Sequence, residues 1–492
     1  MRTSGILLSI SSLPSKYGIG TLGEEAFNFI DFLKEAKQTY WQILPIGPTS
    51  YGDSPYQTFS AFAGNPYFVD IDLLIKDGLL TEDDLKDFDF EFDPEKVDYG
   101  KIYNQRFDIL KLAFNSFDIN DESYLQFLNE NHFWLDNYSL FMALKKHHKG
   151  VAWSDWEDCY KFRDAVALEK FIEENQNEIH FWNFIQYEFF TQWSKLKKYA
   201  NDNGIKIIGD IAIYVAYDSS DVWERPENYR LNKKLDPIEV AGCPPDAFTE
   251  DGQLWGNPIY NWKYMKNEGY SFWVERMKKA NTLFDLTRID HFRGFAGYYS
   301  IPYGDETAKN GKWNKGPGYS LFKKIKEELG DIPIIAEDLG FITDDVRDLL
   351  KKTGFPGMKL IMFGFDSDGT NEHLPHNYQK NCVCYAGTHD NNPICGWIKE
   401  IDEPTLKNCM EYLNTDGYGI CYNMVKEIFK SVADYAIITM QDLLYLDEKA
   451  RMNTPSKVGS NWVWRMKKEA LTDELSERLK HYSYIFNRNL GE

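Results

Sequence analysis

Residues 286–294 read Leu-Thr-Arg-Ile-Asp-His-Phe-Arg-Gly, a short apolar run that ends in charged side chains. Leu286 and Ile289 suit a β-strand. Alternate side chains of a strand share a face, so Arg288 and Asp290 point to the same side. A guanidinium beside a carboxylate favours the ionised carboxylate, which is the form that nucleophilic attack requires. A purely structural Arg–Asp pair would look the same in the sequence. This stretch therefore indicates a functional site only if other strands also end in charged residues.

Seven further apolar runs have the length and composition of strands. They span residues 5–10, 40–44, 205–210, 333–338, 357–362, 382–386 and 435–442. Amphipathic helices are predicted between several of them, including 24–34, 321–329, 344–352 and 419–431. Strands that alternate with helices, with almost no hairpin turns, favour an α/β fold. We therefore predict a (β/α)8 TIM barrel with helical insertions and long active-site loops, rather than a doubly wound sheet.

The chain is predicted to be one barrel interrupted by insertions. Residues 1–67 hold the first two strands and a site loop, and residues 68–200 form a mainly helical insertion. Residues 201–492 hold the remaining strands, with a loop insertion at about 230–262. Loops at 52–67 and 242–260 are rich in Gly, Pro and aromatic residues, and barrel loops of such length are usually functional.

The helical insertion is expected to end in a helix at 180–200 that returns to the barrel. Helical spacing predicts that its buried positions include Leu110, Phe114, Leu125, Leu128, Phe141 and Leu144. His147 and His148 are interpreted as solvated helix surface.

The composition favours a neutral ligand. The chain has 76 acidic and 55 basic residues, a net charge of −21, which disfavours nucleic acid or an anionic membrane as partner. No run approaches the roughly 18 apolar residues that cross a bilayer, and the N-terminus lacks a secretory signal. Seven scattered cysteines predict reduced thiols in a cytoplasmic protein. Aromatic residues make up 16% of the chain; their flat rings suit the apolar faces of sugars, although ordinary packing uses them too.

Charged residues at the predicted strand ends should meet, because the C-terminal strand ends of a barrel converge on one mouth. They are Asp210, Arg288, Asp290, Glu337, His389, Asp390 and Asp442. Retaining glycoside chemistry needs two carboxyl groups about 5 to 5.5 Å apart, and neighbouring strands lie about 4.8 Å apart. Asp290 and Glu337 end successive strands and form a candidate pair. Taken singly, Glu337 fits a charged turn and Asp390 a helix cap.

Two other interpretations concern metal and nucleotide binding. His373, His376, Cys382 and Cys384 are candidate metal ligands, but cysteines at i and i+2 of a strand lack zinc-ribbon spacing. Residues 18–23, Gly-Ile-Gly-Thr-Leu-Gly, match a dinucleotide fingerprint only in letters. They are separated from the preceding strand, and no ribose-binding acid follows the next one, so a tight loop into a helix is predicted.

Three motifs resemble the catalytic signatures of the amylomaltases, the 4-α-glucanotransferase or disproportionating enzyme family of the α-amylase clan. They are Arg288-Ile-Asp-His-Phe-Arg-Gly294, Ala336-Glu-Asp-Leu-Gly340 and Gly387-Thr-His-Asp-Asn391. Further matches at 41–48, 54–57, 209–215, 254–258 and 461–465 extend the resemblance over nearly the whole chain in order. Ala212 stands where the family pattern has proline, which leaves the carboxylate at Asp210 in place.

The resemblance implies a role for each motif residue. Asp290 would be the nucleophile, Glu337 the general acid and base, and Asp390 a transition-state carboxylate. The expected substrate-binding residues are Tyr56, Asp210, Trp255, Asn257, Arg288, His291 and His389. Among them Trp255 would form a lid on the acceptor side, unless it only anchors its loop.

The resemblance also implies the reaction and its participants. The expected activity is a retaining transfer of α-1,4-glucan segments between malto-oligosaccharides, with no organic cofactor and no catalytic metal. An α-glucan hydrolase with the same carboxylates, or a non-catalytic glucan-binding protein, would share much of this sequence. The residues carry no signal for the oligomeric state.

Overall fold

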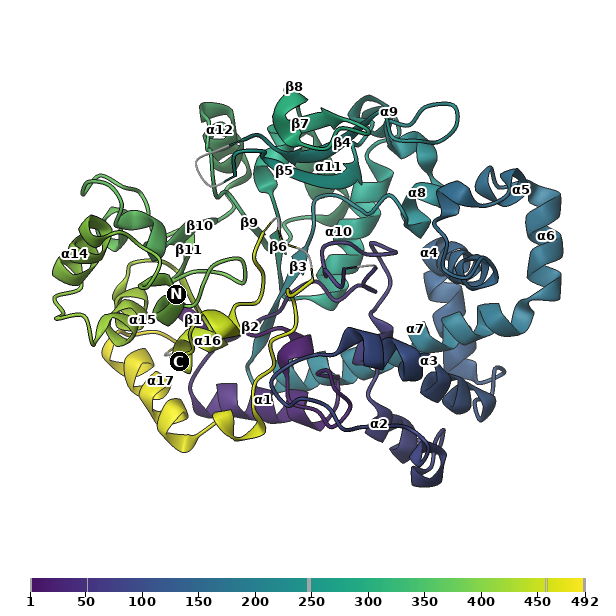
Figure 1. Ribbon diagram of the computed structural model, residues 1–492, viewed down its shortest axis with the longest axis horizontal. Helices are drawn as coiled ribbons and strands as arrows, with labels where there is room; N and C mark the ends of the chain where they lie inside the picture. The colour runs from purple at the N-terminus through teal and green to yellow at the C-terminus, as the bar shows by residue number, and fades with distance from the viewer. Residues whose placement is uncertain (1, 51, 246–248, 456, 458, 490–492) are drawn as a thin grey trace.

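Eight parallel strands form a barrel at the centre of the chain (Figure 1). The computed structural model describes residues 2–50, 52–245, 249–455, 457 and 459–489. Around the barrel the strand order is β10-β11-β12-β1-β2-β3-β6-β9. The strands are β1 (Thr3–Leu7), β2 (Tyr40–Gln42), β3 (Lys206–Ile211), β6 (Leu286–Ile289), β9 (Ile334–Ala336), β10 (Gly357–Leu360), β11 (Cys382–Tyr385) and β12 (Tyr435–Thr439). All eight predicted strands are confirmed, as is the barrel.

The end strands of this order, β9 and β10, meet through hydrogen bonds at their tips. The backbone N–H of Ala336 donates to the carbonyl of Pro356 at 3.0 Å. The buried carboxylate of Asp338 accepts from the backbone N–H of Met358 at 2.6 Å. These two bonds bring the outer edges of the sheet together and complete the ring.

The alternation of side chains along each strand separates two apolar layers. Leu7, Ile208, Leu286 and Ile335 belong to one cluster inside the barrel. The neighbouring strand positions pack outward against the helices; Trp41, for example, lies with its ring edge-on to Phe29. Residues two and four positions after an interior leucine therefore also face inward, which aims the polar strand ends at the barrel axis.

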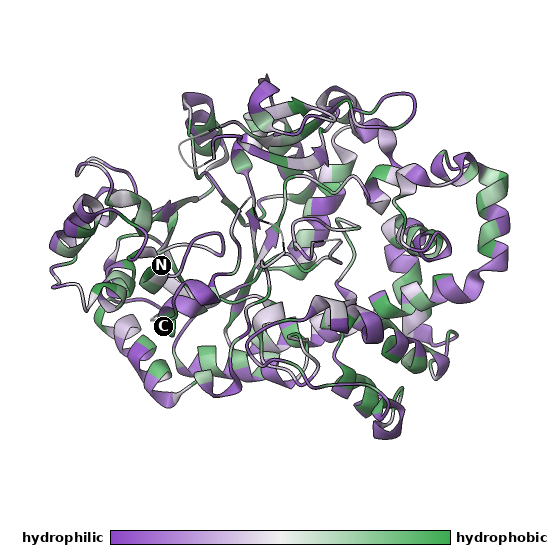
Figure 2. Cartoon of the chain, in the orientation of Figure 1, coloured by the Kyte–Doolittle hydropathy of each residue, from purple (hydrophilic) through white to green (hydrophobic). Residues whose placement is uncertain are grey.

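Helices cover the outside of the barrel, and Figure 2 shows hydrophobic and hydrophilic residues distributed around them. In α1, which confirms the helix predicted at 24–34, Ala26, Phe29, Ile30 and Leu33 form a buried face, as expected for a helix against a sheet. The helices that follow or precede barrel strands are α1 (Glu24–Glu35), α8 (Ser220–Glu224), α9 (Trp262–Asn267), α10 (Ser271–Leu283), α11 (Tyr319–Leu329), α12 (Asp344–Thr353), α13 (Ile394–Trp397), α14 (Glu403–Tyr412), α15 (Ile420–Lys430), α16 (Met440–Leu443) and α17 (Asp473–Ile485).

The stretch 68–200 is helical, as predicted. It contains α2 (Ile71–Lys76), α3 (Tyr99–Asn115), α4 (Glu122–His147), α5 (Asp158–Lys161), α6 (Ala165–Glu174) and α7 (Gln176–Asp202). Two interpretations in it are wrong. Leu125 is 48% exposed, because it lies in the first turn of α4 on the outer side. His148 is not a solvated surface residue, because its ring stacks on Trp156 and its Nε2 forms a hydrogen bond with the Glu157 carboxylate. The division into units at residues 67 and 200 stays a prediction.

The loop expected at 242–260 is instead part of a second, antiparallel sheet. Its order is β5-β4-β7-β8, with β4 (Glu239–Cys243), β5 (Gln253–Pro258), β7 (Gly297–Pro302) and β8 (Lys312–Lys315). The pairing of β4 with β5 shifts between Val240 and Gly242. Glycine, proline and this irregular register hide the strand pattern in the sequence, so the expected near absence of hairpins is wrong.

A disulfide joins Cys395 in α13 to Cys421 in α15. The expectation of reduced thiols is therefore wrong for this pair, because the fold brings together two cysteines that lie 26 residues apart in sequence. Among the described residues, no helix is long and apolar enough to cross a membrane. The cytoplasmic location stays a prediction.

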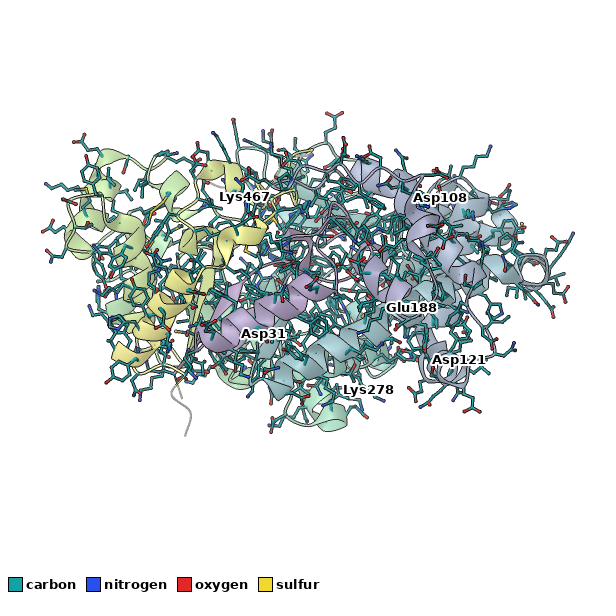
Figure 3. All side chains as sticks on the ribbon, turned by 90° about the horizontal axis from the view of Figure 1, so that it is seen from below. Asp31, Asp108, Asp121, Glu188, Lys278 and Lys467 are labelled. Carbon is teal, nitrogen blue, oxygen red and sulfur yellow. A yellow bond between two sulfur atoms is a disulfide. The ribbon has the colours of Figure 1, made fainter. Side chains whose placement is uncertain are left out.

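Glu188, labelled in Figure 3, is a buried carboxyl group of α7, and the pH dependence of stability tests its burial. Its side chain is buried, and this burial, reinforced by Asp77, raises the pKa of the carboxyl to about 7. The folded pKa of Glu188 lies above its unfolded value. Below about pH 4.5 the group is protonated in both states and does not lower the free energy of unfolding, but as pH rises toward 7 the free energy of unfolding falls. Glu188→Gln should therefore raise the free energy of unfolding at pH 8 by roughly 2–4 kcal/mol.

Melting temperatures of this variant at pH 5 and pH 8 check the expectation. The gain should be clearly larger at pH 8. Glu173→Gln, at an exposed position in α6, is the matched control and should leave both temperatures unchanged. An equal gain at both pH values would contradict the titration argument.

Candidate active site

Arg288 lies at the centre of the polar strand ends. Leu286, Arg288 and Asp290 occupy successive inward positions, and β3 pairs with β6 so that Asp210 lies beside Arg288. One guanidinium nitrogen donates to both oxygens of Asp210, at 2.8 and 2.7 Å. The other donates to Asp290 Oδ1 at 3.0 Å. Arg288 is only 2% exposed, so these charge-assisted bonds lie largely out of water and are strengthened by the low dielectric.

Glu337 lies across the strand pair from Asp290. β6 and β9 pair Ile289 with Ala336, which brings the next residues of the two strands side by side. The backbone N–H of His291 donates to Glu337 Oε2 at 2.6 Å, and that of Leu339 donates to Oε1 at 2.8 Å. His291 reaches this position with a left-handed φ of 51°. Two backbone donors thus fix the orientation of the Glu337 carboxyl group.

The two carboxyl groups differ in their electrostatic environment. Burial, followed by the charge of Asp290, raises the pKa of Glu337 to about 8. Burial also raises the pKa of Asp290, but Arg288 opposes this shift and donates directly to the carboxylate. When the pair holds one proton, Glu337 carries it and Asp290 is ionised. The site therefore presents an acid and an anion side by side at neutral pH.

Tyr56 connects this pair of strands to the other side of the mouth. Its hydroxyl donates to Asp210 Oδ2 at 2.9 Å and lies 2.9 Å from His389 Nε2. Because Asp210 takes the hydroxyl proton, Nε2 of His389 must be the donor to Tyr56. Burial lowers the pKa of His389 to about 4, so its ring is neutral. The rings of Tyr56 and His389 also stack, with centroids 5.4 Å apart.

Asp390 follows His389 at the same mouth and is the more open carboxylate. Its side chain is 38% exposed, with Oδ2 3.4 Å from His389 Nε2. Asn453 donates to Oδ1 at 2.6 Å, and Arg451 donates to the Asp390 carbonyl at 2.7 Å. Asn453 comes from the irregular segment after β12, where the sequence pattern gives no signal for a site residue.

The segment of β5 that carries Trp255 and Asn257 borders the mouth. The ring of Trp255 lies edge-on to that of His291, with centroids 4.8 Å apart. Gln57 donates to the carbonyl of Trp255 at 3.2 Å and to Asn257 Oδ1 at 3.0 Å. Asn257 in turn donates to the carbonyl of Val215 at 2.8 Å. Gln57 is not among the predicted substrate-binding residues, although it belongs to the motif that contains Tyr56.

Asp442 is the strand-end residue that does not join the group. Its carboxylate accepts from the backbone N–H of Ile394 at 2.7 Å and from the hydroxyl of Thr439 at 2.7 Å, and the residue is 2% exposed. It therefore anchors the start of α13, and the expectation that it shares the cleft is wrong.

The candidate metal ligands have structural partners. His373 Nδ1 accepts from Leu360 N at 3.1 Å, and Cys384 lies 3.2 Å from the hydroxyl of Ser431. In the part of the chain that the structure describes, no group of three or more His, Cys, Asp or Glu residues could hold a metal ion. Residues 18–23 form the predicted turn into α1, which begins at Glu24.

Comparison with known proteins gives full-length matches. The family model described as 4-alpha-glucanotransferase matches residues 8–472. A 4-alpha-glucanotransferase of Clostridium butyricum is 50% identical over 485 residues, covering 98% of this chain and 100% of its own length. One from Streptococcus pneumoniae serotype 4 is 48% identical over 492 residues, covering 99% and 97%. A solved amylomaltase from Streptococcus agalactiae in complex with acarbose has a TM-score of 0.96 at 43% identity, covering 99% and 100%.

Proposed function

This chain belongs to the 4-alpha-glucanotransferase family, and from that premise we propose that its barrel mouth moves α-1,4-glucan segments between malto-oligosaccharides. The observation that carries the proposal is the pairing of Glu337, held protonated, with Asp290, held ionised by Arg288. An acid beside an anionic nucleophile is the arrangement that retaining glycoside chemistry uses.

The first half of the reaction breaks the donor glucan. Glu337 donates its proton to the glycosidic oxygen, so the leaving sugar departs as a neutral alcohol. Asp290 attacks the anomeric carbon and forms a covalent glycosyl ester as the old bond breaks. Glu337 is then a carboxylate that accepts from the backbone N–H groups of His291 and Leu339.

The second half reverses these steps with a new sugar. Glu337 removes the proton from the 4-hydroxyl of the acceptor, whose oxygen attacks the anomeric carbon. The bond to Asp290 breaks, the carboxylate is restored beside Arg288, and Glu337 is again protonated. Two displacements at one carbon retain its configuration, and the number of glycosidic bonds does not change.

The remaining mouth residues position the sugar. Asp390 is exposed enough to accept hydrogen bonds from sugar hydroxyls, and Asn453 holds its other oxygen. His389 and Tyr56 form a neutral, stacked pair beside Asp390. We assign Asp210 to a supporting role, because both of its oxygens already accept from Arg288.

Products formed from maltotriose test the proposal. A transferase yields both longer and shorter glucans, a hydrolase only shorter ones, and a non-catalytic binding protein leaves the trisaccharide unchanged. Full-length similarity to named 4-alpha-glucanotransferases favours the first outcome. Failure to form any chain longer than maltotriose would reject transfer.

Trp255→Ala tests why a sugar rather than water completes the reaction. We expect Trp255 to form an apolar platform for the acceptor glucose, beside the neutral ring of His291. Loss of the platform should lower transfer about tenfold while hydrolysis falls less, because only the sugar acceptor uses stacking for orientation. The ratio of glucose release to chain transfer measures this.

Trp262→Ala is the matched control for the loss of indole packing. Trp262 is also partly buried, but it packs in α9 against Tyr260 and Phe295. This variant should lose stability without a change in the ratio. If Trp255→Ala instead lowers both activities equally and destabilises the fold, Trp255 is a packing residue.

A further inference from the structure

Two exposed aromatic rings lie beside the mouth and have no role in the reaction described above. Trp313, in the edge strand β8, is 42% exposed, and Phe341, four residues after Glu337, is 74% exposed. Large exposed apolar side chains that lie together usually mark a binding surface. We call this pair of rings the glucan rim.

Arg293 joins the two parts of the glucan rim. Its guanidinium lies over the Trp313 ring, 3.9 Å from the ring centroid, and also donates to the backbone carbonyl of Phe341. Arg293 is itself 6% exposed and belongs to the turn that directly follows Asp290. Arg293 thus contacts both the Trp313 ring and the backbone of Phe341 from the turn that follows Asp290.

The Trp313 ring is held in a defined orientation. Tyr299 pairs with Trp313 in the register of β7 and β8, and its ring packs edge-on at a centroid distance of 5.3 Å. The hydroxyl of Tyr299 donates to the carbonyl of Ala308 at 3.0 Å. With Arg293 on the ring and Tyr299 at its edge, Trp313 loses little side-chain entropy when a ligand stacks on it.

The position of the glucan rim limits the ligand that reaches it. Phe341 follows Glu337 by four residues, so the two Cα atoms are at most about 14 Å apart. Figure 1 shows β8 and α12, the helix that the Phe341 loop enters, at the same end of the molecule. The glucan rim therefore lies within reach of a glucan chain that is held at Asp290 and Glu337 and extends along the mouth.

We propose that Trp313 and Phe341 form an additional subsite for α-1,4-glucan chains that extend beyond the sugars held at the Asp290–Glu337 pair. The proposal rests on the proposed function for its ligand class. Arg293 lies over the Trp313 ring and Tyr299 packs against its edge. The exposed remainder of the ring can stack on the apolar face of a glucose unit. Phe341 adds a second apolar contact, so the glucan rim favours long substrates over short ones.

Binding in a background that cannot turn over substrate tests this directly. Each rim variant is made in the Asp290→Asn protein, and dissociation constants are measured by calorimetry for maltotriose and maltoheptaose. Trp313→Ala should raise the Kd for maltoheptaose about tenfold and change that for maltotriose less than about twofold. Phe341→Ala should raise the maltoheptaose Kd about threefold. Trp313→Phe, which keeps an aromatic face, should recover most of the affinity.

Tyr484→Ala is the matched control, because Tyr484 is 72% exposed on α17, in a different part of the helical layer. It should leave both constants unchanged. Equal Kd values for Trp313→Ala and its parent with maltoheptaose would overturn the proposal. An equal loss for both ligands would overturn it too, since it would mean that Trp313 acts only by holding Arg293. The maltotriose product assay on the unmodified enzyme judges the proposed function separately.

Discussion

Asp290→Asn and Glu337→Gln are each expected to lower kcat/KM for maltotriose transfer by at least about 10² to 10⁴-fold while the fold is retained. In the mechanism that we propose, Asp290 forms the covalent bond to the sugar, and Glu337 moves the proton in both half-reactions. Both side chains lie at the mouth rather than in the apolar core, so their loss affects chemistry more than packing. Initial rates and melting temperatures measure the two effects. Glu469→Gln, at an exposed position in the chain, should change neither.

The two variants should differ in a way that identifies each role. With a glycosyl fluoride donor, Glu337→Gln should still form the ester, because fluoride leaves without a proton, but it should discharge the ester slowly. Mass spectrometry of the digested protein should then place the sugar on Asp290. A sugar on Asp390 would reverse those assignments, and near-normal turnover by either variant would remove both residues from the mechanism.

The same pair sets the pH dependence of the unmodified enzyme. The proposed mechanism needs Glu337 protonated, so kcat/KM should fall as pH rises through about 8, the value to which burial and Asp290 raise the pKa of Glu337. Activity also needs Asp290 ionised, so it should fall again at low pH, where the carboxylate takes a proton. The two limbs belong to the coupled pair, and both should move when either charge is altered.

The sequence predicts those site residues whose direction follows from the alternation of side chains along a strand. Leu286, Arg288 and Asp290 are two residues apart on one strand, so their common face can be deduced without any tertiary contact. Glu337 needs only the further step that successive barrel strands end at one mouth. The helical face of α1 is equally local, since one period decides which side is buried.

The local sequence pattern does not predict features that depend on distant contacts. Asp442 looks like another strand-end carboxylate, but the segment at Ile394, 48 residues away, folds back and uses it as a hydrogen-bond acceptor. Asn453 contributes to the mouth from an irregular segment, where no period reveals its direction. The sequence predicts a loop where the β4–β5 hairpin lies, because its register shift and glycines interrupt the alternation on which strand prediction depends.

Arg288→Lys is expected to have a comparably large effect, although lysine keeps the positive charge. Arg288 contacts Asp210 with one nitrogen and Asp290 with another, and a single ammonium group cannot reproduce that fork. The lowering effect of Arg288 on the pKa of Asp290 should weaken. Because Asp290 must be ionised, the acidic limb of the kcat/KM profile should move to higher pH, and the maximum should fall at least about 10²-fold.

Arg488→Lys separates this effect from the general cost of replacing a buried arginine. Arg488 is 0% exposed. It donates to the carbonyls of Phe429, Ser431 and Ala433 at 2.6, 2.9 and 3.0 Å. Both variants should lose on the order of 1–3 kcal/mol of stability, since each leaves buried acceptors without a donor. Only Arg288→Lys should shift the acidic limb. If both profiles keep the limbs of the unmodified enzyme, Arg288 supports the fold but does not hold Asp290 ionised for attack.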